Sequence, residues 1–269
     1  MLVSELNDAL FKRFPREDAE SWDHVGLSVG NPQARVETVF ISLDATVDDV
    51  HAAHEAGAQV LVSHHPVYID APEAFTPNVG VFPQASAAVY EAARLGISFL
   101  SYHTNLDRSI EAQEELPRRL GAERIASLEH PDDPNATGLG SYADLRPLTV
   151  QELAERASSA FGVDARVWGE PAATASRCAF LGGSLGHFGE LALGIGAQAV
   201  VTGEAGYHVC QDVSMRGLAV ILLGHDISER PFCNVLARAC EGAGIEKEHI
   251  VVSDFRRQWW TYMKEIGHE

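Results

Sequence analysis

The sequence AGAQVLVSHH at residues 56–65 returns as IGAQAVVTGE at residues 195–204, and each copy has a glycine ahead of an apolar run. A second pair follows in the same order, with GISFLSYHTNLD at 96–107 and GLAVILLGHDISE at 217–229. If one inserted residue is allowed, both members of this pair end their apolar run with the pattern His-x-x-x-carboxylate. Two such matches in the same order indicate an internal duplication.

Short apolar runs alternate with helical patterns along the whole chain. Runs of this kind suit strands that are covered on both faces, as in a mostly parallel sheet. In the first half we expect helices at 2–14, 47–56 and 84–95 and strands at 38–43, 59–63 and 97–101. In the second half we expect a helix at 150–160 and strands at 178–181, 199–202 and 218–223.

The segment HPDDPNATG at 130–138 is dense in turn-forming residues and is the best candidate for a domain boundary. We therefore predict an α/β protein of two related three-layer α/β domains. The first repeat covers residues 1–125 and the second covers residues 126–269. The C-terminal segment from about residue 225 is a candidate to pack into the first domain.

The charge of the chain limits the kinds of molecule that it can bind. A formal net charge of −18 over 269 residues repels phosphate backbones and anionic membranes, so we expect neither a nucleic acid nor a membrane partner. The first residues carry acidic side chains where a signal peptide needs a basic start, which favours a cytoplasmic protein. The four cysteines lie in the second half without a Cys-x-x-Cys pair, and we expect buried thiols.

Polar side chains collect where the expected strands end. Ligands bind at the carboxyl ends of parallel strands, because uncovered strand ends and helix N-termini form a crevice there. The residues at such ends are Asp44, His64, His65, His103, Asp107, Glu204, His208, His225 and Glu229. Their coincidence at related positions of two repeats favours a metal site at the interface between the domains.

Adjacent residues of a pleated strand point to opposite faces, so His64 and His65 serve one site only if the pleat stops. Pro66 stops it, and two imidazoles can then reach two points a few ångströms apart. Two metal ions about 3.5–4 Å apart also need a bridging carboxylate, which Asp107 and Glu229 supply from the two repeats. Imidazole and carboxylate without thiolate favour two divalent ions of iron, manganese or zinc.

Each of these features also has a structural explanation when taken alone. The histidine pair can be a solvated loop, Asp107 a helix cap, and Glu229 an acid in the first turn of a helix. The glycine-rich run GGSLGHFG at 182–189 could cradle an anion, and tight packing of a strand on a helix explains it equally well.

Several motifs together resemble the Nif-three-like proteins, also called GTP cyclohydrolase I type 2 homologues. The resemblance runs in order through essentially the whole chain. Its motifs are SWDHVGLSVGNP from Ser21, SLDAT from Ser42, SHHP from Ser63, HTNLD from His103, TGLG from Thr137, FLGGS from Phe180, TGE from Thr202 in place of TGD, and GHDISE from Gly224. The stretch RSIEAQEEL at 108–116 departs from the glycine-rich pattern of the family.

The resemblance implies two related α/β domains, a dinuclear metal centre between them and a homohexamer. It places the metal ligands on His64, His65, Asp107, His225 and Glu229. His103 matches the family motif as well, and we place it near the metals rather than on one.

The sequence thus predicts a metal-dependent hydrolase that acts on a small molecule, with a purine nucleotide as the candidate substrate that the family name suggests. His103 or His208 would shuttle protons, because imidazole titrates near neutrality. Two other functions stay open: a metal-binding scaffold or regulator without turnover, and a phosphoesterase that uses the same ions.

Overall fold

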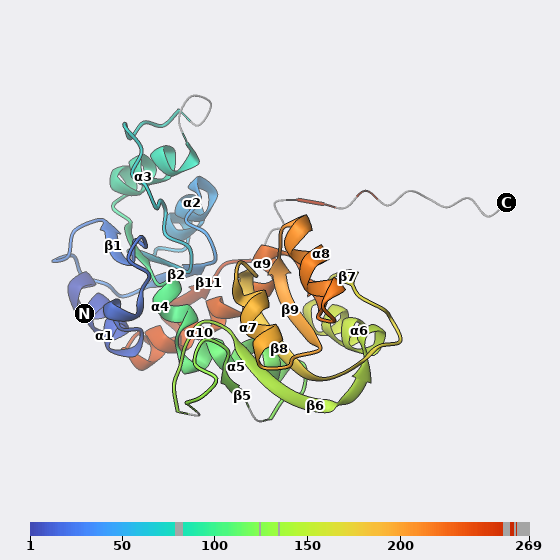
Figure 1. Ribbon diagram of the computed structural model, residues 1–269. Coiled ribbons are helices and arrows are strands. Elements are labelled where there is room, and N and C mark those ends of the chain that lie inside the picture. The colour runs from blue at the N-terminus through green and yellow to red at the C-terminus, as the bar shows by residue number, and fades with distance from the viewer. Residues whose placement is uncertain (79–82, 124, 134, 255–258, 261, 263–269) are drawn as a thin grey trace.

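The chain folds into two β-sheets flanked by helices, as a computed structural model shows (Figure 1). The structure describes residues 1–269 except 79–82, 124, 134, 255–258, 261 and 263–269. The first sheet and α1–α3 form the left-hand half of Figure 1, the second sheet and α6–α8 form the right-hand half, and α5, α9 and α10 lie between them. The predicted α/β class is confirmed.

The first sheet has the strand order β1-β4-β3-β2-β11. Strands β2, β3, β4 and β11 are parallel, and β1 is antiparallel to β4 at one edge. The bounds are β1 Gly26–Val29, β2 Val39–Ser42, β3 Val60–Ser63, β4 Ser98–Ser101 and β11 Ile250–Val252. The helices of the first half of the chain are α1 Val3–Arg13, α2 Val47–Glu55, α3 Gln84–Leu95, α4 Thr104–Asp107, α5 Ile110–Arg119 and the 3-10 turn η1 Arg16–Asp18.

The second sheet has the order β5-β6-β8-β9-β10-β7, with β8, β9 and β10 parallel. Its strands are β5 Ile125–Ser127, β6 Ser141–Thr149, β7 Arg166–Trp168, β8 Thr174–Ser184, β9 Ala199–Glu204 and β10 Ala219–Leu222. The remaining helices are α6 Val150–Phe161, α7 Phe188–Gly194, α8 Tyr207–Met215, α9 His225–Glu229, α10 Pro231–Gly242 and the 3-10 turn η2 Lys247–His249.

Four neighbouring strands have the same order and direction in the two sheets. Strands β2, β3 and β4 lie side by side with antiparallel β1 at the edge, and β8, β9 and β10 lie side by side with antiparallel β7 at the edge. Each half of the chain also contributes one strand to the sheet of the other half. Strand β5 follows α5 and joins the second sheet, whereas β11 follows α10 and pairs with β2 of the first. The domain boundary near residue 126 stays a prediction.

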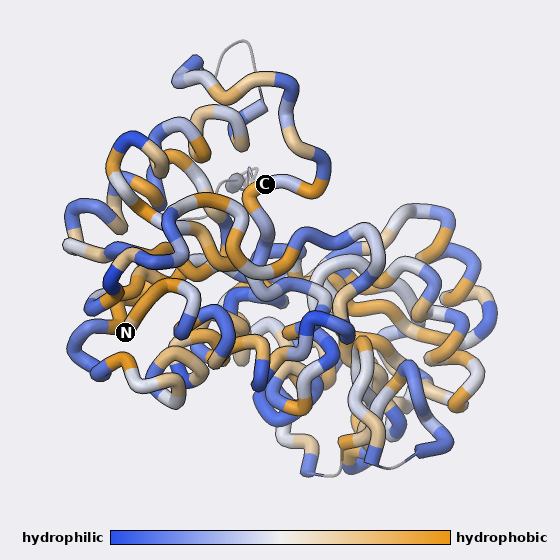
Figure 2. The backbone as a smooth tube through the Cα atoms, turned by 90° about the vertical axis from the view of Figure 1, so that its left-hand side faces the viewer, coloured by the Kyte–Doolittle hydropathy of each residue, from blue (hydrophilic) through white to orange (hydrophobic). Residues whose placement is uncertain are grey.

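Alternate residues of the parallel strands face different helices. In the first sheet Phe40, Leu61 and Phe99 pack in one cluster with residues of α2 and α3. Their neighbours Ile41 and Val62 belong instead to a larger cluster that includes α1, α5, α6, α10 and one face of the second sheet. Both faces are therefore apolar, as the continuous runs predict, and one core joins the two halves. Figure 2 shows hydrophobic segments running through the interior of both halves.

Local signals set the helix ends. Thr46 and Asp49 form a reciprocal capping box at the start of α2, and Gly96 ends α3 in the left-handed conformation.

All four cysteines are buried and free, as expected, and burial raises the pKa of the Cys178, Cys233 and Cys240 thiols to about 12. Within the described residues, no helix has the length and apolar character needed to cross a bilayer.

Replacing Leu236 by alanine should lower the free energy of unfolding by about 2–5 kcal/mol. Leu236 lies on α10, is fully inaccessible to solvent and belongs to the core that joins the two halves, so the change leaves a cavity there. Urea unfolding measures the loss. The control is Val209→Ala on the exposed face of α8, which should change stability by less than about 0.5 kcal/mol. Equal stabilities of the two variants would contradict a shared core.

Candidate metal centre

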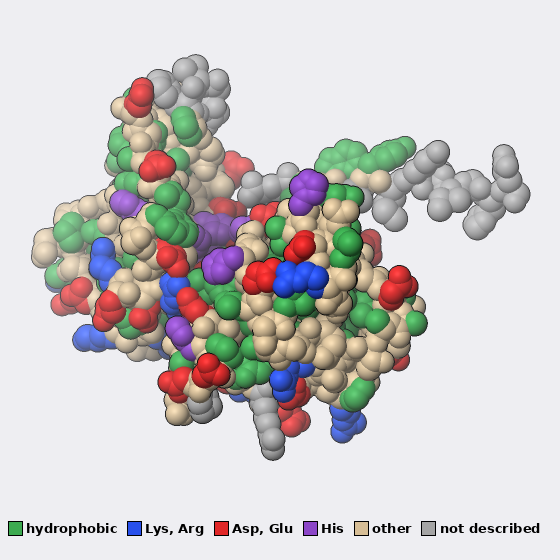
Figure 3. All heavy atoms as spheres, in the orientation of Figure 1, with side chains coloured by type: hydrophobic (Ala, Val, Ile, Leu, Met, Phe, Trp, Pro, Cys, Tyr) green, Lys and Arg blue, Asp and Glu red, His purple; other side chains and the backbone are tan. Residues whose placement is uncertain are grey.

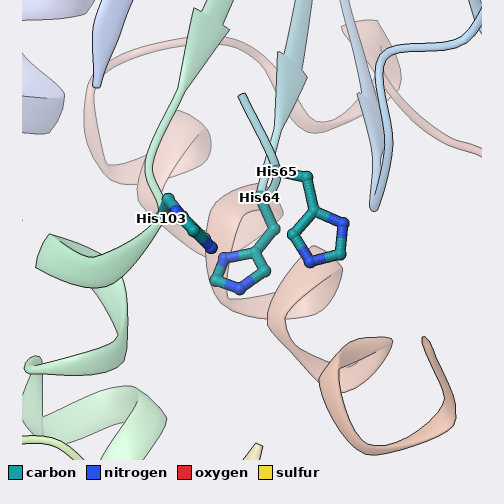
Figure 4. A group of neighbouring side chains, drawn as sticks. All are labelled: His64, His65 and His103. Carbon is teal, nitrogen blue, oxygen red and sulfur yellow. The ribbon is translucent and has the colours of Figure 1, made fainter. Parts of the chain in front are cut away.

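A cluster of histidines and carboxylates lies where the carboxyl ends of the first sheet meet α9. His64 and His65 follow β3, His103 follows β4, and His225 and Glu229 are the first and last residues of α9. Figure 3 shows histidine side chains gathered in the recess between the two halves, with acidic side chains nearby. The imidazoles of His64, His65 and His103 converge in Figure 4.

The backbone after β3 explains how two adjacent imidazoles reach one cluster. The amides of His64 and His65 both donate to the β2 side, to the carbonyls of Ser42 and Leu43. Consecutive amides of a regular strand point to opposite neighbours, so the pleat of β3 ends before Pro66. The two ring centroids lie 5.1 Å apart at an interplanar angle of 42°. The adjacent rings therefore address two neighbouring points, as the sequence predicts for the segment ahead of Pro66.

Three imidazoles are oriented in the same way. The Nδ1 atom of His64 donates to the carbonyl of Tyr102 at 3.0 Å. The corresponding atom of His65 donates to Asp44 at 2.8 Å, and that of His225 donates to Glu204 at 3.0 Å. A carbonyl or carboxylate that accepts at Nδ1 leaves Nε2 free to bind a metal, which is the usual arrangement of histidine ligands.

The Nε2 atoms point at carboxylates in the middle of the cluster. Glu229 Oε2 lies 2.8 Å from His65 Nε2 and 3.1 Å from His225 Nε2. On its other side, Glu229 Oε1 lies 3.8 Å from His64 Nε2, and Asp107 Oδ1 lies 3.6 Å from the same nitrogen. Glu229 is 5% exposed, so its carboxylate is held between imidazole side chains instead of being solvated.

One nitrogen of this cluster lacks a hydrogen bond. His64 Nε2 is buried and has no hydrogen-bond partner, although both nearby carboxylates face it. An unsatisfied buried polar atom costs about 1–3 kcal/mol, which a bound cation would recover. The residues of the cluster therefore fit a metal ion, and the sets His64, His65, His103 and His65, His225, Glu229 each bring their ligand atoms within 4.8 Å of one another.

Burial and the neighbouring charges shift the pKa values of the histidines and carboxylates in the cluster. Burial disfavours the charged form of His65, but hydrogen bonds to Asp44 and Glu229 outweigh it and raise its pKa to about 10. The hydrogen bond to Glu229 also raises the pKa of His225 to about 9. Burial opposes ionisation of Glu229, yet the three surrounding imidazoles hold its pKa well below the ordinary value. Burial raises the pKa of Asp107.

Two glycines make room for α9. The sequence offers tight packing as one explanation for the run that contains Gly183, but it assigns no role to Gly203. A Cβ atom at Gly183 would overlap Glu229 Oε1, and one at Gly203 would lie 2.8 Å from the Cα atom of His225. The amide of Gly183 also donates to Ser228 Oγ at 2.9 Å. Close packing against α9 thus accounts for the first glycines of the run at 182–189. In the repeat Gly203 aligns with His64, so the two copies differ at this point.

His103 and His208 occupy different surroundings. The His103 ring lies 5.2 Å from that of His64 and 5.6 Å from that of His65, and its Nδ1 donates to Asp23 at 3.0 Å. His208 is exposed on α8 and lines a separate pocket with His187. No interaction among the described residues links His208 to the cluster, so the structure does not bring it to those side chains. Its predicted role in proton transfer has no geometric support.

Comparisons with known proteins agree with this architecture. Residues 1–257 match the sequence profile of the Duf34/NIF3 (NGG1p interacting factor 3) family. A Streptomyces coelicolor protein named GTP cyclohydrolase 1 type 2 homolog is 32% identical, over 87% of this chain and 83% of its own. Two crystal structures share the fold: a Bacillus cereus protein related to NIF3, with a TM-score of 0.88 at 19% identity, and a Staphylococcus aureus hypothetical protein, with 0.86 at 22%. Each alignment covers 98% of this chain and 99% of the other.

Protein stripped of metal by a chelator should lose stability as the pH rises from 7 to 10. The pKa values of His65 and His225 are raised from 6.5, so the folded state binds these protons more tightly than the unfolded chain. Their stabilisation is complete below about pH 6.5 and is lost as the pH passes about 9 and 10. Urea unfolding at several pH values measures this. The His225→Gln variant should show a shallower decline, and equal slopes would contradict the assignment.

Replacing Gly203 by alanine should push α9 away from β9 and reduce both stability and metal uptake. The added Cβ would lie 2.5 Å from the Gly183 carbonyl oxygen and 2.6 Å from Ser228 Oγ, and overpacking of this kind costs about 1–3 kcal/mol. Urea unfolding and elemental analysis give the two readouts. The control is Gly194→Ala at the end of α7, where the new Cβ meets nothing within 4 Å. Full metal uptake by the Gly203 variant would show that α9 tolerates the shift.

Proposed function

The chain belongs to the Duf34/NIF3 family, and from this premise we propose that it is a metal-dependent hydrolase with a dinuclear centre. The observation that carries the proposal is the placement of Glu229. One of its oxygens faces His65 and His225, and the other faces His64, which also faces Asp107. A carboxylate with a separate ligand group on each oxygen is what a bridging ligand between two cations requires.

The ligands divide into two sets on this basis. His64 and Asp107 would hold one cation, and His65 and His225 would hold the other. Glu229 would bridge them. Imidazole and carboxylate donors without thiolate suit iron, manganese or zinc. The carbonyl of Tyr102 and the carboxylates of Asp44 and Glu204 would keep the three imidazoles in the orientation that binding needs.

Five protein ligands over two cations leave coordination positions open for water and substrate, whereas a purely structural site is closed by protein ligands. When bound, the two cations would supply Lewis-acid chemistry and lower the pKa of a coordinated water towards about 7. The chain's own residues would hold the cations apart at Glu229 and keep the imidazoles neutral at Nε2. They would also leave the partly exposed side of His225 accessible.

The name of the Streptomyces relative suggests the substrate. We propose hydrolysis of a small molecule, with ring opening of a purine nucleotide as the first reaction to test. A homohexamer is the assembly that the family resemblance implies, and we propose a cytoplasmic location. Two alternatives keep the same ligands: a phosphoesterase, and a metal-binding scaffold without turnover.

Glu229→Gln should reduce bound metal from two equivalents to one or none, because the variant loses the bridging charge. Asp107→Ala should lose the cation on the His64 side and retain one equivalent. Elemental analysis of protein reconstituted with zinc measures both, with circular dichroism to show that the variants fold. The matched control is Glu190→Gln on the exposed part of α7, which should keep two equivalents. Two equivalents in the Glu229 variant would refute the bridging role.

Protein loaded in turn with manganese, iron or zinc is then screened against GTP and against bis(p-nitrophenyl) phosphate. Turnover of GTP that disappears in Glu229→Gln supports the nucleotide hydrolase, and turnover of the diester alone supports the phosphoesterase. No turnover with any metal, in protein shown to hold two equivalents, would favour the scaffold.

A further inference from the structure

Asp23 is a buried carboxylate beside the cluster that the ligand sets do not include. It lies in the loop ahead of β1, and its side chain is 0% exposed. Its Oδ1 accepts from His103 Nδ1 at 3.0 Å, and its Oδ2 accepts from the amide of Thr104 at 3.0 Å and from the Thr104 hydroxyl. Because β1 pairs with β4, the loop is brought against the residues that follow β4.

These contacts determine the ionisation state of Asp23 and the tautomer of His103. Burial opposes ionisation of Asp23, but the hydrogen bonds from His103 and Thr104 outweigh it and lower its pKa, so the group is a carboxylate at neutral pH. A carboxylate only accepts, so the proton of His103 that it binds is on Nδ1. The lone pair of neutral His103 is therefore on Nε2, at the opposite side of the ring from Asp23.

His103 brings a ring nitrogen within 4.8 Å of ligand atoms of His64 and His65, but its carboxylate partner is Asp23 instead of Glu229. Its ring contacts the rings of His64 and His65, and the exposed side chain of Trp22 packs edge-on against it at 6.0 Å between centroids. His64, His65 and His225 each have Nε2 within 4.0 Å of Glu229. Among the described residues, the carboxylate within that distance of His103 is Asp23, on the Nδ1 side. With 18% of its side chain exposed, His103 can also be reached from solvent.

We propose that Asp23 is a positioning residue that holds His103 with Nε2 directed at the metal cluster, where His103 acts as a proton acceptor and not as a metal ligand. The proposal rests on the hydrolase function proposed above. A water at the cluster would give one proton to Nε2 as its oxygen attacks the substrate. The O–H bond breaks, an N–H bond forms, and Asp23 offsets the charge of the imidazolium. The bond between the attacked centre and the leaving group then breaks, and the same proton passes from Nε2 to the leaving group.

The position of His103 can be tested without any activity. Protein with isotope-labelled histidine is loaded with a magnetically active cadmium isotope, and nitrogen–cadmium couplings are read by NMR. We expect couplings at Nε2 of His64, His65 and His225, no coupling at His103, and a proton on Nδ1 of His103. A coupling at His103 would show that His103 is a metal ligand. That result would overturn this inference and leave the proposed hydrolase function standing. Uptake of fewer than two cadmium equivalents would instead count against the dinuclear centre.

The role of Asp23 is tested with Asp23→Ala. Metal content should stay at two equivalents, while the proton of His103 moves from Nδ1 towards Nε2, the site that imidazole prefers without a partner. The kcat for bis(p-nitrophenyl) phosphate, or for GTP if that is the substrate turned over, should fall about 100-fold or more with little change in KM. An unchanged tautomer or an unchanged kcat would overturn the proposal.

The matched control is Thr104→Val, which removes the hydroxyl bond to Asp23 and leaves the contact between His103 and Asp23 in place. It should lower stability without moving the His103 proton or kcat. An equal loss of kcat in this variant would show that Asp23 acts only by anchoring its loop. If wild-type protein with two equivalents of metal turns over neither substrate, the proton transfer is overturned together with the hydrolase.

Discussion

The architecture of the cluster depends on one buried carboxylate. Glu229 is brought from the second half of the chain by the short helix α9 and lies against His64 and His65 of the first half. A buried anion is costly unless charge and hydrogen bonds compensate it. Three imidazoles surround Glu229, and in the absence of a cation the raised pKa values of His65 and His225 place positive charge beside it.

The two oxygens of Glu229 are satisfied to different degrees. His65 Nε2 and His225 Nε2 lie 2.8 Å and 3.1 Å from one oxygen, whereas His64 Nε2 is buried without a hydrogen-bond partner beside the other oxygen and Asp107. A bound cation would give His64 Nε2 the contact that the protein does not supply.

Much of this arrangement could be predicted from the repeated sequence. The two patterns His-x-x-x-carboxylate after apolar runs place Asp107 and Glu229 at related strand ends, and Pro66 explains why adjacent imidazoles can diverge. The duplication also agrees with the order that four neighbouring strands share in the two sheets. These predictions succeed because they need only local periodicity and the rule that parallel strands present their carboxyl ends at one edge.

Other features depend on long-range packing that one sequence does not reveal. Asp23 reaches His103 because β1 pairs with β4, and β11 joins β2 across more than 200 residues. The role of Gly203 follows from the path of α9 over β9, which no local pattern specifies. His208 follows a strand, as the other candidates do, but it lies on α8 and lines a pocket with residues of α7 and α8, and its role in proton transfer stays a prediction.

The most direct test of the account is anomalous diffraction from crystals of zinc-loaded protein. The account predicts two zinc peaks about 3.5–4 Å apart, one on each side of the Glu229 carboxylate. A single peak, or peaks elsewhere on the surface with none beside Glu229, would contradict the dinuclear centre.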